Sequence, residues 1–143
     1  MKKSEDRSQK TEDRITIAIP KGRNLKPSVE LFKSIGLDGS PILEDTRRLL
    51  FDLSRENVKF LVIRDTDIPT YVEYGAADIG VSGKDVLMEQ GRDIYEPLDL
   101  KFGFCRIVLA EPKELRAEDD PSKWTHIRVA TKFPRITENY FRN

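Results

Sequence analysis

The pattern of apolar and polar positions between Phe60 and Met88 predicts two strands and two helices with almost no connecting residues. Residues Phe60 to Ile63 form an apolar run typical of a strand that is buried on both faces of a parallel sheet. Asp67 is placed to cap the helix that follows, and Pro69 suits its first turn, where the missing N–H has no intrahelical partner. Gly75 suits the end of that helix, which needs a left-handed residue.

A second buried strand is predicted at Ala77 to Val81, and Gly83 opens a turn before a helix that starts at Lys84. A crossover helix joins parallel strands of one sheet in a right-handed unit. Ligands in such sheets bind beyond the carboxyl ends of the strands. The residues expected at this rim are Arg64, Asp65, Ser82 and Gly83.

The segment before this unit predicts one more strand and one more helix. Ile15 to Ile19 is an apolar strand, and Pro20 to Arg23 follows as a tight basic turn. Apolar residues then recur at helical spacing from Asn24 to Ser34, and Gly36 ends the element. The apolar face of this helix is expected to consist of Leu25, Val29, Phe32 and Ile35.

Two further features lie between this helix and Phe60. Turn-forming residues occupy Asp38 to Asp45, with a short apolar patch in their middle. Arg47 to Leu53 is predicted to be a strand, and Ser54 to Asn57 is a polar, hairpin-like connection into the next strand, which begins at Val58.

The two ends of the chain differ in character from its middle. Met1 to Asp13 has no apolar residue after the first methionine, so this stretch is expected to be a disordered tail. Phe104 to Ala110 and His126 to Thr131 are predicted strands, and a helical face begins at Ile136. Because that last unit is incomplete, its apolar residues are expected to be partly exposed, namely Ile107, Val108, Ile127, Val129, Phe133 and Phe141.

Composition excludes several classes of protein. The 143 residues include 35% charged residues that balance to a formal net charge of zero, which argues against a nucleic-acid partner. One cysteine and one histidine exclude a disulfide framework and a Cys/His metal cluster. No apolar run is long enough for a transmembrane helix or a signal peptide, so a cytoplasmic location is expected.

The Lys21-Gly22-Arg23 turn is the first candidate for chemistry. It places two cations and a flexible backbone at a helix N-terminus, where free N–H groups favour an anion. A solvated basic loop is the alternative interpretation. Arg47 and Arg48 start a predicted strand, so their side chains should point to opposite sides; a surface ion pair is the alternative for either.

The remaining reactive residues have ordinary structural interpretations. Cys105 lies in an apolar run without a neighbour that would lower its pKa, which favours a packed thiol. His126 starts a predicted strand and has no catalytic sequence context. The aspartates are typical of helix caps and turns, although they could also help to hold a magnesium ion that is bound mainly through substrate phosphates. These aspartates are Asp65, Asp67, Asp78 and Asp85.

Five segments, in order, resemble the catalytic subunit of the ATP phosphoribosyltransferase family in its short form. They read IAIPKGR, TRRLLF, LVIRDTDIPTYVEYGAADIGVSGKDVL, LDLKFGFCRIVLA and RVATKFP. The resemblance implies a two-domain α/β fold similar to type II periplasmic binding proteins, with the active site between the domains. It also implies the first reaction of histidine biosynthesis, in which N1 of the ATP adenine attacks C1 of phosphoribosyl pyrophosphate and displaces pyrophosphate in the presence of magnesium.

The same resemblance assigns roles to individual residues. Arg47 and Arg23 match positions that contact nucleotide and pyrophosphate, and they are the expected catalytic residues. Further substrate-binding positions are implied at Lys21, Gly22, Arg64, Asp67, Tyr71, Gly83 and Lys84. Magnesium is expected to arrive with the substrate, and no protein metal site is expected.

The resemblance also implies an organisation into domains and partners. Residues 14–102 are expected to form a nucleotide-side domain I, and residues 103–143 the start of an incomplete domain II, after a tail at residues 1–13. The family's phosphoribosyl pyrophosphate loop is not among the 143 residues, so an N-terminal fragment with little activity of its own is expected. Homo-oligomers and a histidyl-tRNA-synthetase-like regulatory subunit are the implied partners. A non-catalytic nucleotide-binding or assembly module is the alternative.

Overall fold

The computed structural model of the protein describes residues 14–44, 47–53, 56–113, 123 and 126–142. The chain divides into two compact units, one that ends at Gly103 and one that begins at Phe104. The predicted tail at residues 1–13 lies outside the described residues, as do residues 54–55 of the predicted hairpin connection. Within the described part, no helix has both the length and the apolar character needed to cross a bilayer.

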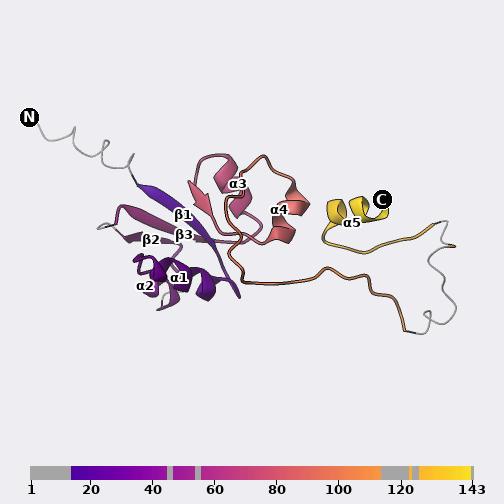
Figure 1. Cartoon of the computed structure of the whole chain (residues 1–143), viewed down its shortest axis with the longest axis horizontal. Coiled ribbons are helices and arrows are strands. Elements are labelled where there is room, and N and C mark those ends of the chain that lie inside the picture. Colours follow the sequence, from indigo (N-terminus) through magenta and orange to yellow (C-terminus); the bar gives the residue numbers. More distant parts are fainter. Residues whose placement is uncertain (1–13, 45–46, 54–55, 114–122, 124–125, 143) are drawn as a thin grey trace, which may run out of the picture. The chain divides into compact units, whose positions relative to one another are not determined.

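The first unit is built on a four-stranded mixed sheet with the order β2-β3-β1-β4 (Figure 1). Strands β1 (Ile15–Pro20), β3 (Val58–Ile63) and β4 (Ile79–Gly80) run parallel, as the sequence predicts. Strand β2 (Leu50–Leu53) pairs antiparallel with β3, which confirms the hairpin. β1 lies between β3 and β4, so the strands before and after the crossover helix are not direct neighbours.

Alternating side chains on β1 fill cores on both faces of this sheet. Ile17 and Ile19 pack into a cluster with α1 (Leu25–Ser34) and α2 (Ser40–Glu44), while Ala18 packs against α3 (Ile68–Glu73) on the other face. Figure 1 shows α1 and α2 on one side of the sheet and α3 on the opposite side. A strand covered on both faces needs such a continuous apolar run.

Helix α1 follows its prediction except at its end. Val29 and Phe32 are buried, and Gly36 adopts a φ of 92° just after the helix. Ile35, predicted to lie on the buried face, is 68% exposed, so that prediction was wrong. The helical repeat no longer applies there, because Ile35 is already the C-cap residue.

Helix α2 occupies a stretch that the sequence predicted only as turn-forming. The Asp38 carboxylate accepts hydrogen bonds from the Ser40 N–H and hydroxyl at the start of this helix. These bonds lower the pKa of the Asp38 carboxyl, mainly through the Ser40 hydroxyl. Ile42, one of its five residues, is buried in the core. The sequence signal that could have predicted this helix is the position of Asp38 two residues before Ser40.

Two predicted elements are shorter than expected. β2 begins at Leu50 rather than Arg47, and β4 covers only Ile79 and Gly80 instead of a buried five-residue strand. Ile79 is 48% exposed, and β4 is an edge strand with a partner on one side only. Asp67 stands at the N-cap of α3, but its side chain makes no capping hydrogen bond, which corrects that expectation.

Gly80 allows α3 to pack directly on the backbone of β4. A Cβ at this position would lie 2.5 Å from Cγ2 of Ile68 and 2.9 Å from Cγ2 of Val72. We expect Gly80→Ala to push α3 away and to lower the free energy of unfolding by roughly 1–3 kcal/mol, the usual cost of overpacking. Urea denaturation of Gly80→Ala and of Ile79→Val, a small change at the half-exposed neighbour, checks this. Equal stability of the two variants would contradict the close packing.

The second unit lacks the strands that the sequence predicted. In its described residues, 104–110 and 126–131 belong to no strand, and their side chains are exposed. Backbone groups of a strand need a partner strand, and apolar sequence alone does not provide one. The expected partial exposure is confirmed for Ile107, Val108, Ile127, Val129, Phe133 and Phe141. Helix α5 (Pro134–Arg142) forms where a helical face was predicted.

Candidate functional site

Three loops leave the same edge of the sheet because the three strands before them are parallel. Pro20 of β1 lies opposite Ile63 of β3, and Ala18 lies opposite Gly80 of β4. The Lys21 N–H donates a hydrogen bond to the Ile63 carbonyl at 2.8 Å, which joins the first two loops at their base. The predicted site residues that follow β1, β3 and β4 therefore share this edge.

The antiparallel strand β2 brings a fourth segment to the same place. Leu50, its first residue, pairs with Leu61, and the Val62 N–H donates to the Leu49 carbonyl at 2.7 Å. Residues just before β2 thus lie at the carboxyl end of β3. We call four exposed cations of this edge the cationic rim: Lys21, Arg23, Arg47 and Arg64.

The turn after β1 leads directly into the N-terminus of α1. Gly22 has a φ of 86°, and an added Cβ would meet nothing within 4 Å, so the backbone is open to a ligand. The Leu25 N–H donates to the Gly22 carbonyl at 3.0 Å and closes the turn. Asn24 is the N-cap of α1 but makes no side-chain capping bond. Helix N-termini of this kind attract anions through their N–H groups and dipole.

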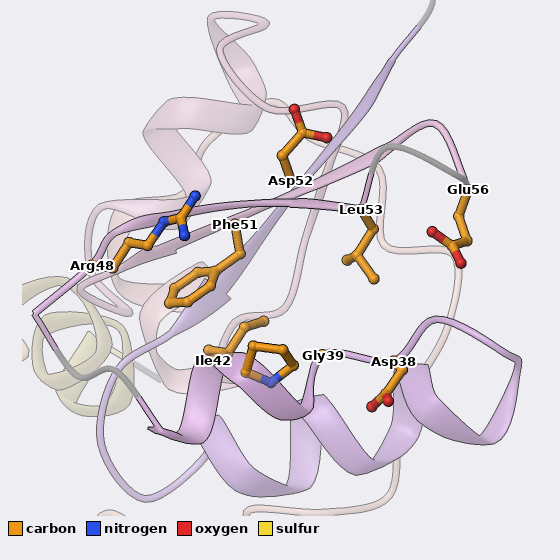
Figure 2. A pocket seen from close by; sticks show the side chains of 9 residues that line it. Asp38, Gly39, Ile42, Arg48, Phe51, Asp52, Leu53 and Glu56 are labelled. Carbon is orange, nitrogen blue, oxygen red and sulfur yellow. The ribbon is translucent and has the colours of Figure 1, made fainter.

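Arg48 is held against β2 by two described contacts. Arg48 Nε donates to the Leu50 carbonyl at 2.7 Å, and its guanidinium lies 5.3 Å from the centre of the Phe51 ring. Figure 2 shows Arg48 beside Phe51 in a hollow between β2 and α2. Arg48 therefore has a structural role against β2, and of these two neighbours we assign Arg47 to the cationic rim.

The hollow of Figure 2 has a volume of about 420 Å³ and is distinct from the rim. Phe51 and Ile42 form its apolar walls, and none of the predicted site residues is among its described lining residues. Two of its three described acidic side chains already have partners, because Asp52 pairs with Arg14 and Asp38 bonds to Ser40. The hollow therefore does not form the candidate site.

The loop after β3 presents two carboxylates at the rim. Asp65 Oδ1 accepts the Thr66 N–H at 2.9 Å, and Asp67 donates its N–H to the Arg64 carbonyl at 3.0 Å. Both aspartate side chains are exposed. Tyr71 lies farther along on α3 and is 38% exposed.

The loop after β4 is shaped by Asp85. A Cβ on Gly83 would lie 2.4 Å from Asp85 Oδ1, so a larger residue here would require this carboxylate to move. Lys84, the first residue of α4 (Lys84–Gln90), contacts both carboxylate oxygens of Glu96, at 2.8 and 2.6 Å. The structure thus places Gly83 and Lys84 near the rim, with Lys84 engaged by an acidic side chain.

Cys105 and His126, for which the sequence favoured a structural role, lie in the second unit. Cys105 is exposed, so the prediction of a packed thiol was wrong. His126 is exposed and lies outside any described strand. Within the described ranges, no three acidic, cysteine or histidine side chains come close enough to hold a metal ion.

Comparisons with known proteins agree on one family. A family model described as ATP phosphoribosyltransferase matches residues 64–143. The chain is 59% identical over 129 residues to the ATP phosphoribosyltransferase of Citrifermentans bemidjiense, covering 90% of this chain and 61% of that protein. It is 48% identical to the same enzyme of Acidithiobacillus ferrooxidans, covering 90% of this chain and 60% of that protein.

A solved structure is similar in fold as well. It is a chain of the ATP phosphoribosyl transferase (HisG:HisZ) complex from Thermotoga maritima, with a TM-score of 0.69 and 33% sequence identity. The match covers 90% of this chain and 58% of that chain. The chain therefore spans about three fifths of the length of the proteins that it resembles.

Proposed function

The chain belongs to the ATP phosphoribosyltransferase family, and from this premise we propose that it supplies the nucleotide side of an enzyme that transfers phosphoribose to ATP. The reaction joins N1 of the adenine to C1 of phosphoribosyl pyrophosphate and releases pyrophosphate. The observation that carries the proposal is the cationic rim, which gathers four cations from three segments at one sheet edge. Ligands of open α/β sheets bind at this edge.

Charge stabilisation on the departing pyrophosphate is the main task of such a site. The ring nitrogen of adenine is a weak nucleophile without a proton for a general base to remove, so the barrier depends on the leaving group. Arginine suits this task, because its planar guanidinium can hold two phosphate oxygens and stays charged. We assign this role to Arg47 and Arg23.

The remaining predicted residues are assigned to substrate binding. Lys21 and Gly22 form the anion-binding turn, and Arg64, Asp67 and Tyr71 follow β3 on the side of α3. Gly83 and Lys84 complete the edge at β4. Magnesium would be held mainly by substrate phosphates, with Asp65 and Asp67 supplying carboxylate oxygens at the rim, and it would neutralise phosphate charge.

The solved relative favours a larger assembly. Its title names a HisG:HisZ complex, and we propose that this protein likewise assembles with a histidyl-tRNA-synthetase-like regulatory subunit and with further copies of itself. We also propose that its domains follow the periplasmic-binding-protein-like arrangement and that it acts in the cytoplasm.

Calorimetry with each substrate separates an enzyme from a non-catalytic module. ATP and phosphoribosyl pyrophosphate are titrated separately into the natural protein, and the release of pyrophosphate is then measured with both present. An enzyme binds both ligands and forms phosphoribosyl-ATP. A protein that binds ATP alone and releases no pyrophosphate would be the assembly module instead.

Gly22→Val tests whether the turn after β1 binds the nucleotide through its backbone. The side chain has room, but a β-branched residue is strained at a φ of 86° and covers the backbone that a phosphate would approach. We expect ATP binding to weaken at least tenfold, a change of about 1.4 kcal/mol, while the protein stays folded.

Gly36→Val is the matched control for this substitution. Gly36 has a similar φ of 92° and equally open surroundings, but it follows the opposite end of α1. We expect the same small loss of stability and an unchanged ATP affinity. Equal affinities of the two variants for ATP would indicate that Lys21 to Arg23 form a solvated basic loop.

A further inference from the structure

A buried hydroxyl group without a partner lies just after β4. The Ser82 Oγ is inaccessible to solvent, and no described residue forms a hydrogen bond with it. An unpaired buried hydroxyl costs about 1–3 kcal/mol, and most buried polar atoms in proteins have a partner. Alanine at this position would avoid the cost, so the serine points to a partner supplied by a ligand.

The position of Ser82 in the sheet places this hydroxyl near the cationic rim. Gly80 of β4 lies opposite Ala18 of β1, and the Val81 N–H donates to the Ala18 carbonyl at 2.9 Å. Ser82 therefore lies beyond the carboxyl end of β4, the edge at which β1 continues from Pro20 into Lys21, the first cation of the rim.

The residues that follow Ser82 are already committed to other contacts. The Asp85 carboxylate fills the space beside Gly83, and the Lys84 ammonium contacts Glu96. Within residues 82–85, Ser82 is therefore the residue whose side-chain donor forms no hydrogen bond with the described part of the protein. A hydroxyl is neutral, so it can bind an anion beside the cations of the rim without adding charge.

We propose that the Ser82 side chain, which as a whole is only half-buried, rotates when the nucleotide binds and donates a hydrogen bond from its hydroxyl to a phosphate oxygen. This inference rests on the proposed function, since that function places ATP at the rim. A charged acceptor strengthens such a bond to roughly twice that of a neutral pair. The nucleotide would then satisfy the buried hydroxyl that the protein leaves unpaired.

Ser82→Ala should change affinity and stability in different ways. We expect ATP to bind roughly 10- to 100-fold more weakly in calorimetry, because a hydrogen bond to a charged group is lost. Inorganic tripolyphosphate should lose affinity by a similar factor, because the bond goes to phosphate. The Tm without ligand should not fall, because the removed hydroxyl had no partner.

Ser28→Ala provides the matched control for stability. Ser28 is also buried, but its Oγ donates to the Asn24 carbonyl at 2.7 Å. Its loss should lower the Tm, in contrast to Ser82→Ala.

The outcomes separate this inference from the function on which it rests. If the unaltered protein fails to bind ATP, both are overturned. If it binds ATP and Ser82→Ala binds equally well, only the inference is overturned. A lower Tm of Ser82→Ala with unchanged affinity for ATP would show that the hydroxyl has a partner within the protein. Weaker binding of ATP but not of tripolyphosphate would show a contact to the base or the sugar. Either result overturns the phosphate contact.

Discussion

Arg47→Ala is expected to raise the activation barrier of phosphoribosyl transfer by roughly 2–4 kcal/mol in the natural protein. Arg47 lies at the carboxyl edge of the sheet because β2 returns antiparallel to β3. Its guanidinium would bind the charge that develops on pyrophosphate as the bond to C1 breaks, an interaction that is stronger in the transition state than in the bound substrate. Steady-state kinetics should therefore show a large loss of kcat with a much smaller change in ATP affinity.

Arg48→Ala is the control for this prediction. It removes the same charge from the neighbouring position, but Arg48 packs over Phe51 and bonds to the Leu50 carbonyl. We expect Arg48→Ala to lower the free energy of unfolding by roughly 0.5–1 kcal/mol. Its loss of kcat should be smaller than that of Arg47→Ala. An unchanged kcat in Arg47→Ala, or an equal loss in both variants, would contradict the role of Arg47.

Phe60→Ala is expected to lower the free energy of unfolding by roughly 3–5 kcal/mol. Phe60 is fully buried in β3, and its ring centre lies 5.2 Å from that of Phe32 in an edge-on arrangement. The substitution would open a cavity between the sheet and α1. Because small domains are stable by only about 5–15 kcal/mol, urea denaturation should show a large shift of the midpoint.

Phe104→Ala makes the same chemical change at an exposed position. Phe104 is 82% exposed at the start of the second unit, so we expect little change in stability. Similar losses in Phe60→Ala and Phe104→Ala would mean that Phe60 does not lie at the centre of the core.

The sequence predicted the elements that are covered on both sides. β1 and β3 each have partner strands on both edges, and β1 is also covered by helices on both faces, so their apolar runs leave one interpretation. α1 has a clear apolar face as far as Phe32. In these segments the local pattern and the tertiary environment agree, which makes prediction from sequence reliable.

Prediction was wrong where the environment decides the outcome. β4 is short because it lies at an edge and has α3 packed on Gly80, neither of which its apolar residues reveal. The apolar run at 104–110 reads as a strand, but no described strand pairs with it. α2 depends on hydrogen bonds from Ser40 to Asp38, within a stretch whose composition is typical of turns.

The candidate site was predictable in part. Loops after the parallel strands were expected at one edge, because the sequence shows the order of strands and helices. The presence of Arg47 at that edge depends on the register of the antiparallel pair, in which Leu50 lies opposite Leu61. The unpaired hydroxyl of Ser82 depends on its burial and its neighbours, which the sequence does not show.

Mapping ATP onto the protein by amide chemical shifts is the most direct test of the central claim that the nucleotide binds at the cationic rim. ATP is titrated into the isotope-labelled chain, and the amide resonances are followed to saturation. We predict that the largest shifts occur at Lys21 to Arg23, Arg64 to Asp67 and Ser82 to Lys84, with smaller shifts at the opposite edge near Asn57. Saturable shifts centred on the hollow between α2 and β2, or no shifts at the rim, would contradict the account.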